Sequence, residues 1–167
     1  CFWGDRLITF KNFNYKYIES KQLNIENLSL EINKGECVLF TGASGCGKTT
    51  IMRVLNGLAP EFFDGGFSGE FKVAHLSIGD RLKEFSKVVG SVFQNPKNQF
   101  FNLDSTSELA FSMENYGYSK SEIQNRIDEV VSDFSAEYLL DRNILELSGG
   151  EKQKLAFMAS MMLDADV

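Results

Sequence analysis

The chain has 167 residues, of which 43% are hydrophobic and 24% charged, so it is large enough to bury the core of one ordinary globular domain. Its net charge of −6 argues against a general DNA- or RNA-binding protein, and it has no run of about 18 apolar residues of the kind that crosses a membrane. The three cysteines (Cys1, Cys37 and Cys46) lack metal-ligand spacing, so we expect reduced thiols, with Cys37 in the core.

The first part of the chain is predicted to be rich in strands. Apolar and polar residues alternate through residues 1–32, which is typical of short strands in a largely antiparallel sheet. A turn is expected at 33–36. Residues 37–41 then form a continuous apolar run, which predicts a strand buried on both faces.

A glycine-rich segment follows this predicted strand and is the most informative feature of the sequence. Residues 42–50 read Gly-Ala-Ser-Gly-Cys-Gly-Lys-Thr-Thr, which fits the phosphate-binding pattern of a glycine, four residues and Gly-Lys-Thr. We expect backbone N–H groups and the start of the next helix to hold the phosphates of a nucleoside triphosphate. Lys48 would reach the β- and γ-phosphates, and the hydroxyl of Thr49 would bind Mg²⁺. The predicted binding residues are Gly42, Ser44, Gly45, Cys46, Gly47, Lys48, Thr49 and Thr50.

The middle of the chain is predicted to alternate helix and strand. Helical spacing of apolar residues predicts a helix over about 48–58, and a loop is expected through the glycine pair at 65–66. Residues 67–78 favour more strand, with His75 in a structural role. Residues 87–93 predict another apolar strand, which would place Gln94 at its end.

The character of the sequence changes over about 104–146, where helices are expected. One helix is predicted over 107–116, and Ser119 with Glu122 forms a capping box that opens a second. A final helix is predicted over about 149–163. It begins at Leu-Ser-Gly-Gly-Glu, where Ser148 can cap the helix and Gly149 and Gly150 leave N–H groups uncovered. Such a terminus can bind an anion, although by itself it could equally be a helix cap without a ligand.

The two motifs, in this order and about a hundred residues apart, resemble the ATP-binding subunit of an ABC transporter. The resemblance covers nearly the whole chain, so residues 1–167 are expected to form one ABC ATPase domain. It implies an α/β fold: a P-loop NTPase (RecA-like) core, an antiparallel β subdomain and an inserted helical subdomain over about 104–146. In this family two such domains close head to tail over ATP. Ser148, Gly149 and Gly150 would then contact the γ-phosphate held by the partner's Lys48.

The resemblance also assigns roles to two further residues. Gln94 matches the family's Q-loop glutamine, which contacts Mg²⁺ or the attacking water, and Gln94 and Lys48 are therefore the predicted catalytic residues. Tyr17, about 25 residues before the phosphate loop, resembles the aromatic residue that stacks on adenine. Tyr15 is the competing candidate, and Tyr17 could instead be an ordinary strand residue packed on the sheet.

The sequence around Gln94 narrows the branch. Residues 92–101 and 108–111 look like the ATPases of energy-coupling-factor importers, which take up vitamins or cobalt and nickel ions. The implied partners are a second ABC ATPase subunit and a separate transmembrane subunit at the cytoplasmic face of the cell membrane, with no nucleic acid. Phe100 and Phe101 would be exposed contacts to the membrane subunit, with core packing as the alternative.

Comparison with the family also predicts what the chain lacks. The strand that ends in Asp-Glu would begin near Val167, so we expect an incomplete domain that is inactive alone; Glu151 serves the helix start and does not replace the missing base. Two other classes stay open: a soluble ABC protein of ribosomes or DNA repair, and a nucleotide-binding module without hydrolysis. An Asp-Glu pair after Val167 would favour an enzyme, and its absence a sensor.

Overall fold

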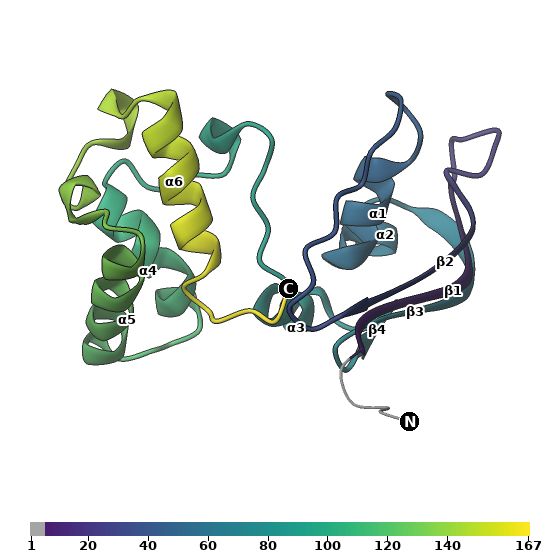
Figure 1. Ribbon diagram of the computed structural model, residues 1–167, viewed down its shortest axis with the longest axis horizontal. Coiled ribbons are helices and arrows are strands. Elements are labelled where there is room, and N and C mark those ends of the chain that lie inside the picture. Colours follow the sequence, from purple (N-terminus) through teal and green to yellow (C-terminus); the bar gives the residue numbers. More distant parts are fainter. Residues whose placement is uncertain (1–5) are drawn as a thin grey trace. The chain divides into compact units, whose positions relative to one another are not determined.

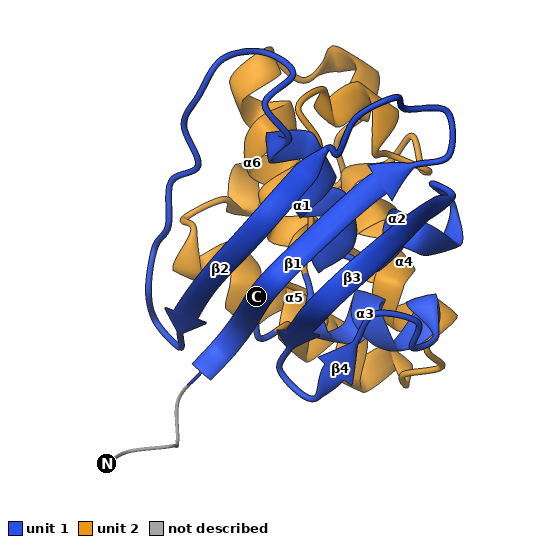
Figure 2. Cartoon of the chain, turned by 90° about the vertical axis from the view of Figure 1, so that its right-hand side faces the viewer, with its two compact units in different colours: residues 1–89, 166–167 blue, residues 90–165 orange. Residues whose placement is uncertain are grey.

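The computed structural model describes residues 6–167, so Cys1 lies outside the described residues. The chain divides into two compact units, one of residues 1–89 with 166–167 and the other of residues 90–165 (Figures 1 and 2). No helix in the described part of the chain is long and apolar enough to cross a membrane.

An antiparallel sheet forms the body of the first unit. Its strands are β1 (Arg6–Tyr17), β2 (Ile25–Asn33), β3 (Gly65–Val73) and β4 (Leu76–Ser77), in the order β2-β1-β3-β4 (Figure 2). The antiparallel sheet predicted from the alternating sequence is therefore present. The glycine pair at 65–66 begins β3 rather than forming a loop, and His75 lies exposed in the turn between β3 and β4 rather than in a strand.

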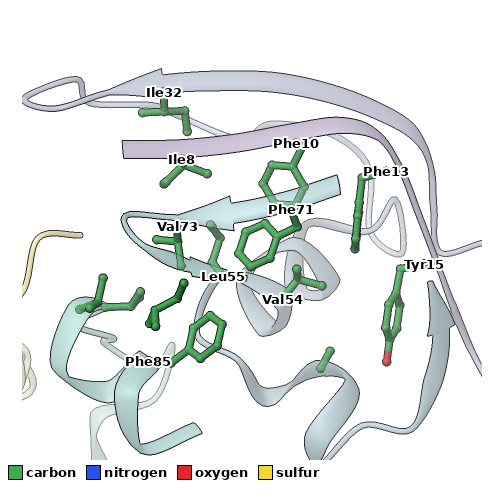
Figure 3. Packing of buried hydrophobic residues seen from close by; sticks show 14 of the residues in the cluster. Ile8, Phe10, Phe13, Tyr15, Ile32, Val54, Leu55, Phe71, Val73 and Phe85 are labelled. Atoms are coloured by element: carbon green, nitrogen blue, oxygen red, sulfur yellow. The ribbon is translucent and has the colours of Figure 1, made fainter. Parts of the chain in front are cut away.

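Helices pack on this sheet and close the first core. They are α1 (Lys48–Leu55), α2 (Leu58–Glu61) and α3 (Leu82–Val88), so the single helix expected over 48–58 ends three residues earlier and a short one follows. Phe10 of β1 packs against Phe71 of β3 with ring centroids 4.8 Å apart, and Val54 of α1 and Phe85 of α3 belong to the same buried cluster (Figure 3). Apolar burial of this kind is the main stabilising contribution to the unit.

Two strands predicted from continuous apolar runs are not present. Residues 37–41 form no strand: Leu39 is 84% exposed and Cys37, expected in the core, is exposed as well. Of residues 87–93, the first two belong to α3. The rest pair with no strand, and Val92 and Phe93 are exposed. A strand exists only where a neighbour supplies hydrogen-bonding partners, and no described segment pairs with either run.

The second unit is helical. It contains α4 (Ser105–Asn115), α5 (Lys120–Asp133) and α6 (Gly149–Ser160), with short 3₁₀ turns η1 (Pro96–Asn98), η2 (Glu137–Leu139) and η3 (Ile144–Glu146). The capping box of Ser119 and Glu122 at the start of α5 is present as predicted. The apolar faces of the three helices form one buried cluster, which includes Leu109, Ile127 and Leu155. The segment 104–146 thus lies within this unit.

Candidate nucleotide site

The glycine-rich segment is an exposed loop that ends at the start of α1. Gly42, Gly45 and Gly47 all have positive φ angles, and Gly47 is the N-cap of the helix. Glycine is required at Gly47, where φ is 95° and a Cβ would lie 2.5 Å from the carbonyl oxygen of Asn24. At Gly45 a Cβ would meet nothing within 4 Å, so this side of the loop is open to a ligand.

Lys48 folds its side chain back over the loop. Its Nζ donates hydrogen bonds to the carbonyl oxygens of Gly42 and Ala43, both at 2.8 Å, and lies 3.4 Å from Sγ of Cys46. The loop carbonyls are thereby turned toward the ammonium group. The first N–H groups of α1 have no acceptor within the helix. An ammonium group beside a helix N-terminus suits a polyphosphate, so the residues present fit the phosphates of a nucleotide.

The two threonines after Lys48 have different surroundings. Thr49 is exposed at the helix start, where its hydroxyl is free to reach a metal ion. Thr50 is buried, and its Oγ1 accepts a hydrogen bond of 3.2 Å from the hydroxyl of Tyr17. The side chain of Thr50 is therefore used within the protein, which leaves its backbone as the part that could serve a phosphate.

Tyr17 lines a cavity of about 560 Å³ in the first unit. The other lining residues are Ile18, Glu19, Ser20, Arg53, Phe62, Phe63 and Asp64. Tyr15 is fully buried, and its hydroxyl donates to the carbonyl oxygen of Phe63, so it has no free ring face. Burial raises the pKa of the Tyr15 hydroxyl, with the neighbouring Tyr17 and Asp64 acting in the same direction. Of the two tyrosines, only Tyr17 is exposed to a ligand in this cavity.

Arg53 is the residue at this cavity that sequence reasoning missed. Its guanidinium lies 3.8 Å from the centre of the Phe63 ring and donates a hydrogen bond of 3.1 Å to the hydroxyl of Tyr17. Its spacing from Thr50, three residues along α1, places both on one side of the helix and was a usable signal. Phe63 gave no such signal, because it lies in the segment between α2 and β3 and has no helical spacing from Arg53.

The Ser148 turn is an open helix start in the second unit. Ser148 and Glu151 form a capping box: the N–H of Glu151 donates to Oγ of Ser148 at 3.3 Å, and the N–H of Ser148 donates to the Glu151 carboxylate at 2.7 Å. Hydrogen bonding of the Glu151 carboxyl to Ser148, to its side chain first and its backbone N–H second, holds the pKa of Glu151 below its ordinary value. A Cβ at Gly149 or Gly150 would meet nothing within 4 Å, so the turn is accessible to another molecule. The helix ends at Ser160, three residues before the predicted end.

Gln94 is exposed. It follows residues 89–93, which form no strand, so it does not lie at the end of a strand as predicted. The neighbouring Gln99 is the residue that organises this segment. Its Oε1 accepts from the N–H of Phe93 at 2.9 Å, and its Nε2 donates to the carbonyl oxygens of Ser91 and Ala156. Gln94 lies in the second unit and Lys48 in the first.

The two phenylalanines after Gln99 differ in exposure. Phe101 is 77% exposed and stacks on Phe111 with centroids 4.8 Å apart, whereas Phe100 is partly buried against the helical core. The prediction that both are exposed is therefore wrong for Phe100. The buried carboxylate of Glu108 accepts from the N–H groups of Phe101 and Asn102 and fixes the backbone at this point.

A glycine loop with a lysine over its carbonyls, set between a sheet and a helix start, defines the class of P-loop nucleotide-binding proteins. Within that class the ABC transporter family profile matches residues 25–167, and the chain belongs to this family. The mixed α/β fold with an antiparallel sheet, predicted from the sequence, is that of its nucleotide-binding domains.

Individual relatives agree with this membership. The chain is 44% identical over 162 residues to an ABC transporter ATP-binding protein from Treponema denticola, an alignment that covers 96% of the chain and 33% of the relative. It is 34% identical over 165 residues to a Bacillus subtilis protein named as the HMP/thiamine import ATP-binding protein YkoD, covering 98% of the chain and 30% of that protein. The chain thus spans about a third of the length of the curated relatives it matches.

Solved structures show the same fold. The structure of cbiO1 from Clostridium perfringens, described as part of the ABC transporter complex cbiONQ, superimposes with a TM-score of 0.85. The match covers 97% of this chain and 63% of that one at 24% identity. A second structure, an ATP-binding subunit of an ABC transporter, gives a TM-score of 0.77 at 21% identity, with 95% and 63% covered.

Proposed function

We propose that the protein is the ATP-binding subunit of an ABC importer, which couples the binding and hydrolysis of MgATP to uptake of a vitamin or metal ion through a separate membrane subunit. The observation that carries the proposal is the open loop in which Lys48 lies over the carbonyls of Gly42 and Ala43 at the start of α1. A polyphosphate would compete for the same ammonium group and gain the loop N–H groups as donors.

The proposed nucleotide contacts follow from the site. The phosphates bind to residues 42–50, and Lys48 contacts the terminal ones. The ring of Tyr17 stacks on the base in the cavity of about 560 Å³, which is large enough for a purine nucleoside. The hydroxyl of Thr49 and the side chain of Gln94 are the proposed ligands of Mg²⁺, which would neutralise charge on the phosphates.

A second ATPase subunit is the proposed partner of the Ser148 turn. Its N–H groups and the positive end of α6 would contact the nucleotide held on the partner's loop, and the lack of any atom near Gly149 and Gly150 supports close approach. The dimer then contains two shared sites.

The surface around Phe101 is the proposed contact with the membrane subunit. The exposed ring of Phe101 stacked on Phe111 gives a rigid aromatic anchor, and Glu108 holds its backbone in place. With this contact, the proposed location of the protein is the cytoplasmic face of the cell membrane. The name of YkoD, an HMP/thiamine import ATP-binding protein, supports a vitamin as cargo, and the description of cbiO1 as part of the complex cbiONQ supports assembly into an ABC transporter.

Reconstitution of the intact protein with its membrane subunits in liposomes tests the proposal. We expect Mg²⁺-dependent ATP hydrolysis and ATP-dependent uptake, measured with thiamine and with Co²⁺ as two separate probes. The matched control is Lys48→Ala in the same complex, which should abolish both activities. Hydrolysis without uptake of either probe would reject import of these cargo classes, and no hydrolysis at all would reject the proposed function.

A further inference from the structure

Lys152 is a charged side chain buried in the second unit, with 8% of its surface exposed. It lies in the first turn of α6, four residues after Ser148. Its Nζ donates hydrogen bonds to the carbonyl oxygens of Leu147, at 2.6 Å, and of Leu145, at 3.1 Å. Leu147 is the residue directly before Ser148, so the ammonium group holds the backbone that leads into the exposed turn.

Burying an ammonium group is costly unless hydrogen bonds replace its water. Among residues 6–167, no salt bridge includes Lys152, so the carbonyl oxygens are its direct partners. These carbonyls belong to η3 and the residue after it, whose apolar side chains Ile144 and Leu147 are buried. Apolar packing therefore fixes the side chains of this segment, and the hydrogen bonds of Lys152 fix its backbone carbonyl groups.

The Ser148 turn is thus fixed from two directions by consecutive residues of α6. Glu151 accepts the N–H of Ser148 on one side, and Lys152 binds the carbonyl oxygen of Leu147 on the other. These are the two ends of the same peptide group, Leu147–Ser148, so its plane has little freedom to rotate. The direction in which Ser148, Gly149 and Gly150 project follows from that plane.

We propose that Lys152 is a positioning residue: it fixes the peptide plane before Ser148 so that the turn is pre-aligned for a phosphate of the nucleotide held by a second subunit. Its buried charge adds to the positive end of α6. This inference rests on the proposed function, in which the Ser148 turn contacts the nucleotide of a second subunit. Misalignment by a fraction of an ångström at such a contact lowers the rate of the chemical step more than the affinity for substrate.

The space around Lys152 provides a conservative variant. The side chain borders a cavity of about 220 Å³ that is also lined by Lys97, Phe100, Asn102, Leu103, Ile144 and Leu145. Because this space can take the extra atoms of a guanidinium, Lys152→Arg should keep both carbonyl contacts. Lys152→Met keeps the length and apolar stem and removes the charge. Lys154→Met is the matched control on the same helix, since Lys154 lies 5.3 Å from the ring centre of Tyr138 and does not contact the turn.

The first test is the ATPase activity of the intact protein with its membrane subunits. Lys152→Met should lower kcat by about tenfold or more and change KM by less than about threefold, because the loop that holds ATP is intact. Lys152→Arg should recover most of the rate, and Lys154→Met should match the wild type. A fall in kcat that is equal in Lys152→Met and Lys154→Met would overturn the proposal.

A second measurement does not depend on hydrolysis. Amide hydrogen exchange of the Ser148 N–H in the chain itself reports its hydrogen bond to Glu151, and Lys152→Met should speed this exchange whereas Lys154→Met should not. An unchanged exchange rate of the Ser148 N–H in Lys152→Met overturns the positioning role. If the wild type fails to hydrolyse ATP but the Ser148 exchange rate responds as expected, the proposed function fails while the support of the turn by Lys152 stands.

Discussion

The hydroxyl of Tyr17, at the end of β1, donates a hydrogen bond of 3.2 Å to the hydroxyl of Thr50, in the first turn of α1. This bond connects the cavity proposed for the base with the helix whose start is proposed for the phosphates. Arg53 binds the same tyrosine hydroxyl from the next turn of the helix. The ring of Tyr17 is therefore held in place before any ligand arrives, which lowers the entropic cost of stacking.

Replacement of Tyr17 separates stacking from anchoring. Tyr17→Ala should weaken ATP binding about tenfold, because base–aromatic stacking contributes about 1–3 kcal/mol. Tyr17→Phe keeps the ring but loses the hydrogen bonds to Thr50 and Arg53, so its affinity for ATP should lie between those of the wild type and Tyr17→Ala. Isothermal titration calorimetry measures the affinity of each variant, with the exposed Tyr118→Ala as control. Equal affinity of Tyr17→Ala and the wild type for ATP would show that the base does not bind in this cavity.

Lys48 supplies a second prediction. Lys48→Ala should weaken ATP binding by roughly a hundredfold, since it removes charge-assisted hydrogen bonds worth about 1.5–3 kcal/mol. Folding should be unaffected, because Nζ contacts the exposed loop and no core residue. Calorimetry with circular dichroism checks both statements, and Lys21→Ala, at an exposed site between β1 and β2, is the control. Tight ATP binding by Lys48→Ala would show that the loop is not part of the nucleotide site.

What could be predicted from the sequence is what short-range rules determine. The glycine loop and the capping boxes at Ser119 and Ser148 each depend on residues within a few positions of one another, and such patterns are visible in the sequence. Strand formation at 37–41 depends on a neighbour, which an apolar run does not specify. The choice between Tyr15 and Tyr17 likewise needed the structure, because alternation places both on one face and burial alone separates them.

Gly47 tests the geometry of the loop independently of any ligand. Gly47→Ala forces a side chain into φ of 95° and brings its Cβ to 2.5 Å from the carbonyl oxygen of Asn24, so we expect a loss of about 1–3 kcal/mol of unfolding free energy. Gly66→Ala should be close to neutral, because Gly66 has ordinary φ and nothing within 4 Å. Urea denaturation measures the difference. Similar stability of the two variants would contradict the close approach of the loop to Asn24.

Glu122 makes the stability of α5 depend on pH. Hydrogen bonds from Ser119, from its side chain first and its backbone second, hold the pKa of Glu122 below the ordinary value of 4.5. A carboxyl whose pKa is lower in the folded than in the unfolded state binds fewer protons when folded. Its stabilising contribution is therefore complete above pH 4.5 and is lost as the pH falls through the folded pKa.

Glu122→Gln separates this contribution from the general effect of acid. Glutamine keeps an acceptor for the N–H of Ser119 but does not titrate, so the variant's urea midpoint should fall less between pH 5 and pH 3 (roughly the range over which Glu titrates) than that of the wild type. Glu114→Gln, an exposed site at the end of α4, should follow the wild type because its carboxylate caps no helix. The comparison is decisive because both variants remove one negative charge. An equal pH dependence in Glu122→Gln and Glu114→Gln would mean that net charge, and not the capping box, controls the acid sensitivity of this unit.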